Sequence, residues 1–495
     1  MDFINWLNGV VWSPVLVFIL LSVGLYYAFA TRFAQFRHVK EMVRLMFEGK
    51  SSSAGISSFQ ALMLSLGDKI GVGNIAGVAT AIAYGGPGAV FWMWIMGFLG
   101  AGIAFIESTL AQVYKTKQEG QFRGGTPYFI EKGLNIKWLA VVFAFITMIT
   151  GAFLLPNIQV NTISSSMETA FNINPMLTGI VLVAILGVII LGGVKRIVRT
   201  AEFIVPFMAA GYIILAVTIC IINITEVPRV FNLIVSSAFG ADATFGAILG
   251  SAIAWGVKRG AFSNGAGFGS ETYAPAAAEV SHPAKQGLVQ SLSTYIDTIV
   301  VCSMTAFSII VTGMYNVNPN GQGAIVDNIG DVEPGPTYTQ LAFDTSLPGF
   351  GSAFLAIAIL FFAFTSMMFY SYMAETGLAY IKNRLQYKQA WPDYVLKIGF
   401  LVSVFVGSVK SAAFAWALGD LGYGSMAWIN IFVILFLSKP ALKVLKDYER
   451  QKKLGIDPVF NPSDVGITSA DFWETEYTNQ EESNESEQNQ QSMYM

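Results

Sequence analysis

Two short stretches combine glycine with polar and charged residues inside runs that are otherwise apolar. One runs from Gly67 to Gly77 with the sequence GDKIGVGNIAG, and the other runs from Gly260 to Ser270 with the sequence GAFSNGAGFGS. Glycine weakens a helix, and a helix that stops leaves peptide carbonyl and N–H groups without partners. Free carbonyl oxygens bind cations, and the N–H groups at a helix start bind carboxylates. The chemistry that these residues favour is therefore the binding of ions and carboxylates.

Close packing between helices is an alternative role for the glycines, since Gly73 and Gly77 form a GxxxG pair. Packing gives no role to the polar residues beside them, which are Asp68, Lys69, Asn74, Ser263 and Asn264. Unwound backbone is tolerated in a bilayer where it lines an enclosed cavity. The second stretch lies in an apolar region, residues 243–280, that would make a helix of nearly 60 Å against a hydrocarbon core of about 30 Å. We therefore expect both helices to be discontinuous.

The elements that must position these stretches are those of a membrane protein. Of the 495 residues, 54% are hydrophobic and 12% are charged, about half the charged share of a soluble protein. The net charge of −3 excludes a basic field for nucleic acid, and two cysteines with two histidines exclude a disulfide framework and a histidine-rich metal site. Eleven apolar segments are long enough to cross a bilayer. They are residues 11–31, 58–84, 88–113, 138–162, 176–194, 203–223, 243–280, 289–313, 350–378, 396–417 and 424–440.

Lysine and arginine concentrate in every second connection between these segments, and the alternate connections contain almost none. Basic connections stay on the cytoplasmic side of a membrane. We therefore expect a multi-pass protein of the cell membrane with its N-terminus outside and its C-terminus in the cytoplasm. The amphipathic stretch 34–57 is expected to include a helix that lies on the bilayer, and the acidic, polar stretch 464–495 is expected to be disordered.

The spacing of the glycine-rich stretches predicts an internal repeat. Segments two to six and seven to eleven make two sets of five, and each set opens with a glycine-rich stretch that crosses in the opposite sense to the other. We predict an all-α membrane protein of about 11 transmembrane helices, with a 5+5 inverted repeat, two discontinuous helices and one extra N-terminal helix. Its regions are 1–57 (extra helix and amphipathic segment), 58–223 (first repeat), 243–440 (second repeat) and 441–495 (largely disordered cytoplasmic tail). This pattern indicates a secondary transporter with its site at the midplane.

Several separated motifs resemble those of the alanine or glycine:cation symporter family, over residues 1–450. They are GGPGAVFWMW at 85–94, GNIAGVATAIA at 73–83, Phe262-Ser263-Asn264 with Ala266-Gly267, His282-Pro283, and Ile296-Asp297-Thr298. The resemblance implies a sodium-coupled symporter of small neutral amino acids, by default alanine or glycine, on the inverted-repeat fold typified by the bacterial leucine transporter. It implies a carrier that works by alternating access, is not an enzyme, and needs no cofactor besides sodium as the coupling ion.

The chain departs from the family pattern at five positions. Val72 stands where threonine is usual, Gly265 where glutamate is usual, and Tyr370 where tryptophan is common. Lys69 stands where arginine is common, and the acid at Asp68 is also atypical. The departures near the ligand leave the carried amino acid open, with serine or glutamine as alternatives to alanine and glycine.

The resemblance implies roles at the two breaks for a substrate with one carboxylate and one ammonium. The carboxylate would meet the backbone N–H groups of Val72 and Gly73, helped by a bound sodium ion. The ammonium would meet carbonyl oxygens near Phe262 and Gly265.

Span four and two aromatic residues supply further candidates. The amides Asn157 and Gln159 follow a proline in span four, and one of them is expected to bind the substrate, with bonding between helices as the alternative. Phe262 and Tyr370 are candidate hydrophobic gates, with simple packing as the alternative.

Alignment of the GVGN run with the wider fold implies up to two sodium sites, since sodium takes oxygen ligands. The first would use backbone carbonyls and hydroxyls, from Gly67, Ile70, Thr365 and Ser366. The second would use Asn74 and Ser263 together with the substrate carboxylate. The alternative for the two hydroxyl residues is a hydrogen bond between helices.

Ionisable residues inside spans are candidates for function. Asp297 could support an ion or pair two helices, whereas Glu107 and Glu375 are expected to pair with basic loop residues. Lys258 and Arg259 would face an outer vestibule if span seven is broken, and would mark its cytoplasmic end if it is not.

Two other functions stay open at this point. Proton coupling on the same fold could use Asp68, Lys69 or Asp297, although the first two could also neutralise each other. A membrane-embedded enzyme or channel is disfavoured because the sequence has no HExxH, no GxSxG, no phosphate loop and no repeated filter motif. The expected partners are thus a small neutral amino acid, sodium and the lipid bilayer; the sequence does not indicate an oligomeric state.

Overall fold

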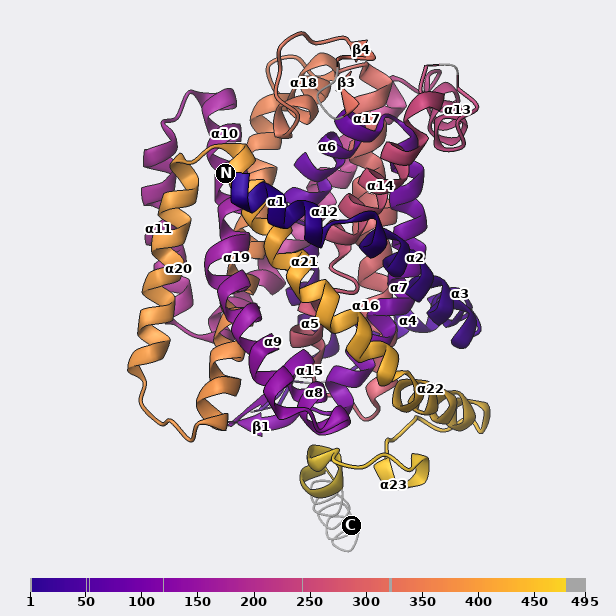
Figure 1. The fold of residues 1–495 in the computed structure, drawn as a ribbon, viewed down its shortest axis with the longest axis vertical. Coiled ribbons are helices and arrows are strands. Elements are labelled where there is room, and N and C mark those ends of the chain that lie inside the picture. The colour runs from indigo at the N-terminus through magenta and orange to yellow at the C-terminus, as the bar shows by residue number, and fades with distance from the viewer. Residues whose placement is uncertain are drawn as a thin grey trace, which may run out of the picture.

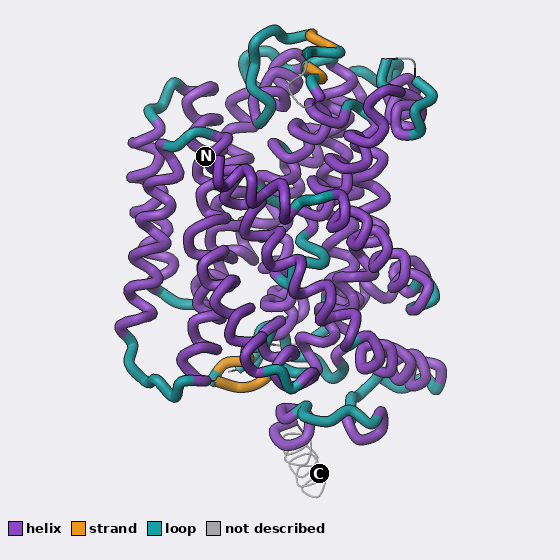
Figure 2. Tube along the Cα trace, viewed as in Figure 1, coloured by secondary structure: helices purple, strands orange, loops and turns teal. Residues whose placement is uncertain are grey.

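The computed structural model describes residues 2–49, 51–52, 54–118, 120–242, 244–319 and 323–477. It consists mostly of helices that run between two ends of the molecule, named upper and lower as they stand in Figure 1. Figure 2 shows loop segments not only at the two ends but also in the middle of the helical layer. Two short antiparallel strand pairs lie at the ends, β1 (Thr116–Gln118) with β2 (Gln121–Arg123) and β3 (Asn316–Val317) with β4 (Val326–Asp327).

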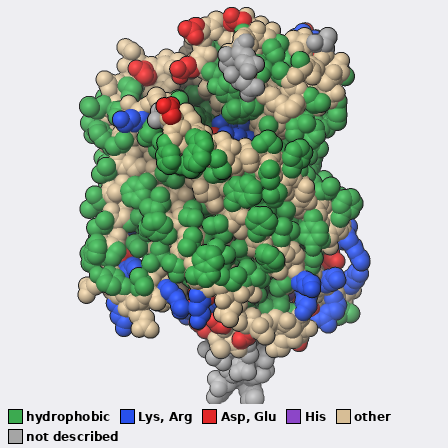
Figure 3. Space-filling model, in the orientation of Figure 1, with side chains coloured by type: hydrophobic (Ala, Val, Ile, Leu, Met, Phe, Trp, Pro, Cys, Tyr) green, Lys and Arg blue, Asp and Glu red, His purple; other side chains and the backbone are tan. Residues whose placement is uncertain are grey.

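Eight helical stretches of the described chain are long and apolar enough to cross a membrane. They are α1 (Asp2–Val11) with α2 (Pro14–Ala30), α7 (Gly88–Val113), α9 (Lys137–Ile149) with η2 (Thr150–Leu154) and α10 (Leu155–Phe171), α12 (Val194–Ile222), α16 (Pro283–Thr294) with η5 (Tyr295–Cys302) and α17 (Ser303–Thr312), α19 (Gly351–Arg384), α20 (Trp391–Val409) and α21 (Ala412–Phe436). Hydrophobic side chains cover the middle of the face in Figure 3, and Lys and Arg side chains gather near its lower end. This make-up is that of a multi-pass membrane protein.

The other helices are shorter. They are α3 (Ala34–Arg37), α4 (Val39–Met46), α8 (Thr126–Leu134), α11 (Pro175–Leu191), α13 (Val227–Ala238), η3 (Gly246–Ile248), α18 (Pro336–Ser346) and α22 (Ser438–Lys453). Helix α4 lies in the amphipathic stretch and buries Met42 and Leu45, and it contacts α16. Part of that stretch therefore packs on the protein itself.

The first glycine-rich stretch interrupts a helix, as predicted. Helix α5 (Ser58–Lys69) begins at Ser57, whose side chain accepts a hydrogen bond from the Gln60 backbone N–H in a capping box. It ends before Gly71, which has an extended backbone, and the chain resumes as η1 (Val72–Asn74) and α6 (Ala76–Gly85). The Asn74 side chain accepts a hydrogen bond from the Gly71 N–H at 3.0 Å, which holds the interruption in place.

The second glycine-rich stretch interrupts span seven, which is also as predicted. Helix α14 (Leu249–Asn264) stops at Gly265, and the chain resumes as η4 (Ser270–Thr272) and α15 (Tyr273–Ala276). Gly265, Gly267 and Gly269 have φ angles of 68°, 93° and 77°, in the left-handed region that side chains disfavour. Glycine at these alternate positions therefore makes the interruption.

Small residues bring the two interruptions together. A Cβ atom added at Gly73 would lie 3.1 Å from the Ser263 Cα, so the backbones of η1 and α14 are in contact. At Gly77, the nearest described atom to an added Cβ belongs to the Trp416 ring and lies 3.8 Å away, an ordinary contact that leaves room for a side chain. Packing therefore accounts for one glycine of the GxxxG pair and not for the other.

Wide helical turns occur in two of the spans beside these interruptions. The η2 segment, between α9 and α10, and the η5 segment, between α16 and α17, are π-helical. Such turns are frequent at functional sites. Asp297 lies in the second of them.

The C-terminal segment is ordered where disorder was expected. Residues 454–477, which include α23 (Pro462–Val465) and η7 (Phe472–Tyr477), lie against the lower end of the molecule (Figure 1). Trp473 is buried and its indole N–H donates to the Gln112 carbonyl at 2.9 Å. The Lys115 ammonium lies 4.5 Å and 5.1 Å from the ring centroids of Phe472 and Trp473. The prediction of disorder is thus wrong for 464–477, because these aromatic side chains pack; residues 478–495 lie outside the described part.

Replacement of Trp473 by alanine is expected to free the C-terminal segment. Loss of a buried tryptophan costs about 3 kcal/mol, so the open state of the segment should be populated roughly 100-fold more. Limited proteolysis of the purified protein should then cleave beyond Leu454 at protease concentrations that leave the parent intact. Trp138→Ala, at a side chain that is 69% exposed, is the matched control; equal resistance of the Trp473 and Trp138 variants would contradict the packing described.

Candidate functional site

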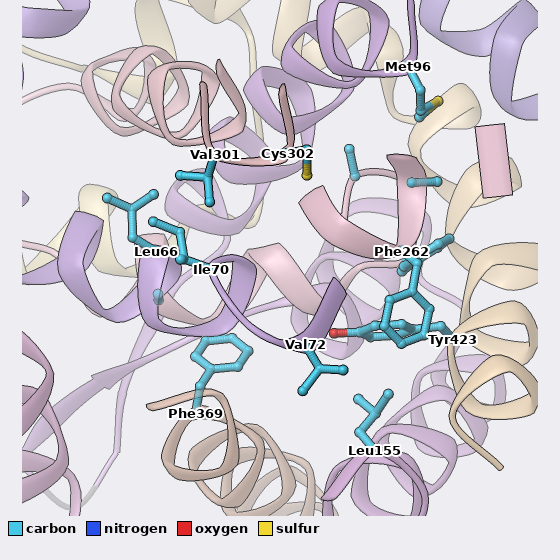
Figure 4. Close-up of a cluster of buried hydrophobic side chains, with 14 of the residues drawn as sticks. Leu66, Ile70, Val72, Met96, Leu155, Phe262, Val301, Cys302, Phe369 and Tyr423 are labelled. Carbon is cyan, nitrogen blue, oxygen red and sulfur yellow. The ribbon is translucent and has the colours of Figure 1, made fainter. Parts of the chain in front are cut away.

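The two interruptions meet in the centre of the helical layer. Figure 4 shows Ile70 and Val72 on the chain of the first interruption and Phe262 beside Tyr423 on the other side, with the Tyr423 hydroxyl directed toward Val72. All four side chains are buried. The start of η1 and the end of α14 therefore enclose one buried centre.

Gln159 connects this centre to two neighbouring helices. Its Oε1 atom accepts a hydrogen bond from the Val72 N–H at 3.3 Å, and its Nε2 atom donates to the Tyr370 hydroxyl at 3.0 Å. Asn157 lies elsewhere, because its Nδ2 atom donates to the Ser403 hydroxyl of α20 at 3.1 Å. Of the two span-four amides, the structure brings only Gln159 to the interruptions, and Asn157 makes the bond between helices that was its alternative role.

Aromatic rings cover the centre on its upper side. The Phe262 ring lies 5.4 Å from Trp416 and 5.0 Å from Tyr423, measured between centroids. Above it, a cleft of about 520 Å³ is lined by Trp416, Arg259 and other residues of the upper end. Figure 3 shows a hollow near the upper end with basic side chains inside it. Phe262 thus stands between the cleft and the centre.

Lys258 and Arg259 lie above the break in span seven, which decides between their two predicted places. The Arg259 Nη1 atom lies 2.9 Å from an Asp420 carboxylate oxygen, and the Lys258 Nζ atom lies 2.7 Å from the other. Both basic residues line the same cleft. Asp420 of α21 thus forms ion pairs with both Lys258 and Arg259 and holds the two basic side chains in the lining of the cleft.

The candidates for the first sodium site come together at the end of α5. The Ser366 hydroxyl donates to the Gly67 carbonyl at 2.9 Å and lies 3.1 Å from the Asp68 carbonyl. Thr365 lies on the same turn of α19, and its Cβ atom would be 3.4 Å from a Cβ atom added at Gly67. Ile70 directly follows the last residue of α5 and is fully buried. The C-terminal end of a helix concentrates partial negative charge, so this group of oxygens is suited to a cation.

The candidates for the second sodium site surround Asp297. One Asp297 carboxylate oxygen accepts from the Asn74 Nδ2 atom at 2.6 Å and from the Ser263 hydroxyl at 3.0 Å. The other accepts from the Thr298 hydroxyl at 2.7 Å. Asp297 is fully buried and therefore joins both interruptions directly. The Asp297 carboxylate and the Ser263 hydroxyl offer oxygen ligands for a hard cation, whereas Asn74 turns its Nδ2 atom to Asp297 and its Oδ1 atom to the Gly71 N–H.

The structure also places Glu271 at the centre, which the sequence did not single out. The Lys69 Nζ atom lies 3.2 Å from the Glu271 Oε2 atom and donates to the Thr294 hydroxyl at 3.0 Å. Both charged side chains are completely buried. The ion pair of Lys69 is therefore with Glu271, across the two interruptions, and not with its chain neighbour Asp68.

Glu107 shapes the second interruption, so its predicted pairing with a basic loop residue is wrong. Its two carboxylate oxygens accept hydrogen bonds at 3.2 Å from the Gly267 and Gly269 N–H groups, and Asn430 also donates to it. These N–H groups lack helical partners because winding stops here. Glu375 does pair with a lysine, since its carboxylate lies 3.5 Å from the Lys397 Nζ atom, although that lysine lies in α20.

A chain of long apolar helices in which two interrupted helices meet at a buried polar centre belongs to the class of membrane carriers. The model of the sodium:alanine symporter family matches residues 1–462, and the chain belongs to this family. The match confirms the family that the sequence motifs indicated.

Relatives in Bacillus species match along nearly their whole length. A protein of Bacillus subtilis, provisionally named a sodium/proton-dependent alanine carrier, is 56% identical over 97% of this chain and 99% of its own. The sodium/proton-dependent alanine carrier of Bacillus sp. strain PS3 is 52% identical over 89% of this chain and 99% of its own. A second Bacillus subtilis protein, provisionally named a sodium/glutamine symporter, is 42% identical over 92% of this chain and 91% of its own.

Proposed function

We propose that the chain is a secondary active transporter that couples uptake of a small neutral amino acid of the alanine type to sodium, by alternating access. The observation that supports this most is the contact between the two interruptions, which places the start of η1 beside the end of α14. A helix start attracts a carboxylate and a helix end attracts a cation. The names of the relatives, which include two sodium/proton-dependent alanine carriers, agree with this function.

The substrate would bind across the two interruptions. Its carboxylate would accept hydrogen bonds from the N–H groups of Val72 and Gly73. The Val72 N–H would then donate to the substrate in place of the Gln159 Oε1 atom. Its ammonium would meet the carbonyl oxygens at the end of α14, near Phe262 and Gly265, where the helix leaves them without partners. Phe262 would close the site toward the cleft, with Tyr370 on its opposite wall.

Sodium would bind at the two oxygen groups described above. A first ion would take the Gly67 and Ile70 carbonyls with the Thr365 and Ser366 hydroxyls. A second would take Asn74, Ser263 and Asp297, beside the substrate carboxylate. An ion there would attract the carboxylate, so that each ligand raises the affinity for the other.

The proposal includes the finer architecture. The eight long apolar helices, with α11 and the two interrupted helices, would give 11 spans in a 5+5 inverted repeat that follows one extra helix. The gathering of Lys and Arg near the lower end supports a cytoplasmic lower end and an outer N-terminus. The cleft above Phe262 would then be an outer vestibule.

Uptake by purified protein in proteoliposomes tests the function. Labelled alanine should accumulate inside when sodium is higher outside, and it should not accumulate when potassium replaces sodium. A pH gradient without sodium separates the proton-coupled alternative. Accumulation that follows the pH gradient alone would contradict sodium coupling, and no accumulation under either gradient would contradict alanine transport.

Replacement of Ser366 by alanine should weaken the first sodium site. The loss of one oxygen that contacts an ion costs about 1.5 kcal/mol, so the sodium concentration for half-maximal uptake should rise roughly tenfold. The maximal rate should change less. Ser308→Ala is the matched control, because the Ser308 hydroxyl bonds only the Met304 carbonyl among the described residues, one turn away in α17. Unchanged sodium dependence in the Ser366 variant would remove this residue from the ion site.

A further inference from the structure

A buried cluster of two acids and one lysine lies directly below the two interruptions. Lys69 and Asp68 end helix α5, and Glu271 lies in η4. The Glu271 Oε2 atom lies 3.2 Å from the Lys69 Nζ atom, and the Asp68 carboxyl accepts a hydrogen bond from the Tyr423 hydroxyl at 3.5 Å. The three side chains are 0–5% exposed.

One oxygen of Glu271 is directed at the second interruption. A Cβ atom added at Gly265 would lie 2.6 Å from the Glu271 Oε1 atom, and this oxygen has no hydrogen-bond donor among the described residues. The Glu271 carboxylate thus occupies the space into which a side chain at position 265 would extend.

When both acids are ionised, the charge of this cluster is unbalanced. Two carboxylates and one ammonium then leave one excess negative charge, and an uncompensated buried charge is costly. The proposed substrate presents an ammonium at the end of α14, beside Gly265, and that ammonium would neutralise the cluster. Its carboxylate would be matched separately by the helix start at Val72 and by sodium.

We infer that Glu271 binds the ammonium group of the substrate through its Oε1 atom, while Lys69 holds its Oε2 atom, and this inference rests on the proposed carrier function. Lys69 fixes the carboxylate in place across the two interrupted helices, with Thr294 as its second partner. Glu271 therefore supplies from η4 a negative charge beside Gly265, where the substrate ammonium is proposed to lie.

The role of Glu271 in binding the ammonium can be tested with a competitor that carries a hydroxyl in place of the ammonium. Lactate has the shape and carboxylate of alanine, but a hydroxyl replaces the ammonium, so unlabelled lactate should compete poorly with labelled alanine for the parent protein. Glu271→Gln should raise the KM for alanine roughly 10- to 100-fold, as expected for the loss of a hydrogen bond to a charged group. It should leave competition by lactate nearly unchanged, so that the preference for alanine over lactate falls by the same factor. A merely structural role would weaken both ligands equally.

Movement of the acid from position 271 to position 265 gives a second test. Gly265→Glu alone should not transport alanine, because its side chain would collide with Glu271. The double variant Gly265→Glu, Glu271→Ala should recover alanine uptake and the preference over lactate relative to Gly265→Glu alone. Glu375→Gln, which removes a half-buried acid that is paired with a lysine, is the control and should keep both values.

The outcomes separate this inference from the proposed function. A Glu271→Gln variant that keeps the parent KM and preference overturns the inference, as does an equal loss of preference in Glu375→Gln. If the parent protein transports no alanine under a sodium gradient, the proposed function itself fails. If Glu271→Gln does not fold, the double variant decides. The inference is overturned if Gly265→Glu folds and the double variant Gly265→Glu, Glu271→Ala shows no more alanine uptake than Gly265→Glu alone.

Discussion

Gly73→Leu should abolish alanine binding and uptake. A Cβ atom at position 73 would lie 3.1 Å from the Ser263 Cα and 3.5 Å from the Phe262 ring, so a leucine side chain fills the space between the two interruptions. It would cover the N–H groups that are proposed to take the substrate carboxylate. Binding of labelled alanine to the purified variant, and uptake in proteoliposomes, should both fall to background.

Gly250→Leu is the matched control for this experiment. Gly250 lies in the first turn of α14, and no other part of the described chain lies within 4 Å of an added Cβ, so the same side chain should be accommodated and uptake retained. Elution and melting temperature of the Gly73 variant should show a folded protein. Normal uptake by folded Gly73→Leu would contradict the proposed carboxylate site.

Asp297→Asn should raise the sodium concentration for half-maximal uptake by roughly 10- to 100-fold, as expected when one charge-assisted contact is lost. The asparagine keeps the shape and can still bond Asn74 and Ser263, but it brings no negative charge to the ion. Uptake measured over a range of sodium concentrations gives this value directly. The KM for alanine should rise as well, since sodium and substrate raise the affinity for each other.

Asp344→Asn provides the control for the loss of one carboxylate. Asp344 lies in α18 at the upper end, in a helix that contains none of the ion candidates, and accepts a hydrogen bond from the Gly349 N–H at 3.1 Å. Its variant should keep the sodium dependence of the parent. A parallel change in both variants, or none in Asp297→Asn, would remove Asp297 from the proposed ion site.

The interruptions could be predicted from the sequence because their cause is local. Gly265, Gly267 and Gly269 adopt positive φ angles, which other residues disfavour, and the apolar length of span seven exceeded a bilayer. Family membership followed from motifs that lie in order along the chain. These properties depend on residue type and spacing, which a sequence displays.

The partners of the buried acids could not be predicted, because they depend on contacts between distant segments. Glu107 meets the backbone of Gly267 and Gly269, which are free N–H donors only once the helix has stopped there. Glu271 follows the second glycine stretch, but nothing in its neighbours shows that it faces Lys69 from another helix. The partners in each pair are far apart in the sequence, although their atoms lie close together in the structure.

The choice between Asn157 and Gln159 depended on which helix face turns inward. Residues two apart on a helix point in directions about 200° apart, so one of them had to face the interruptions and the other α20. The π-helical turn of η2 just before them shifts the phase of the helix, and apolar residues surround both in the sequence. The burial of Trp473 was missed for another reason. Its neighbours in the sequence are polar, and only the folded structure shows that its ring is buried.

A density map of the protein with alanine and sodium bound would show both ligands in place. We expect the alanine carboxylate at the N–H groups of Val72 and Gly73, its ammonium between the end of α14 and Glu271, and ion density beside Ser366 or Asp297. Alanine bound in the cleft above Phe262, or anywhere that leaves the two interruptions free of ligand, would contradict this placement.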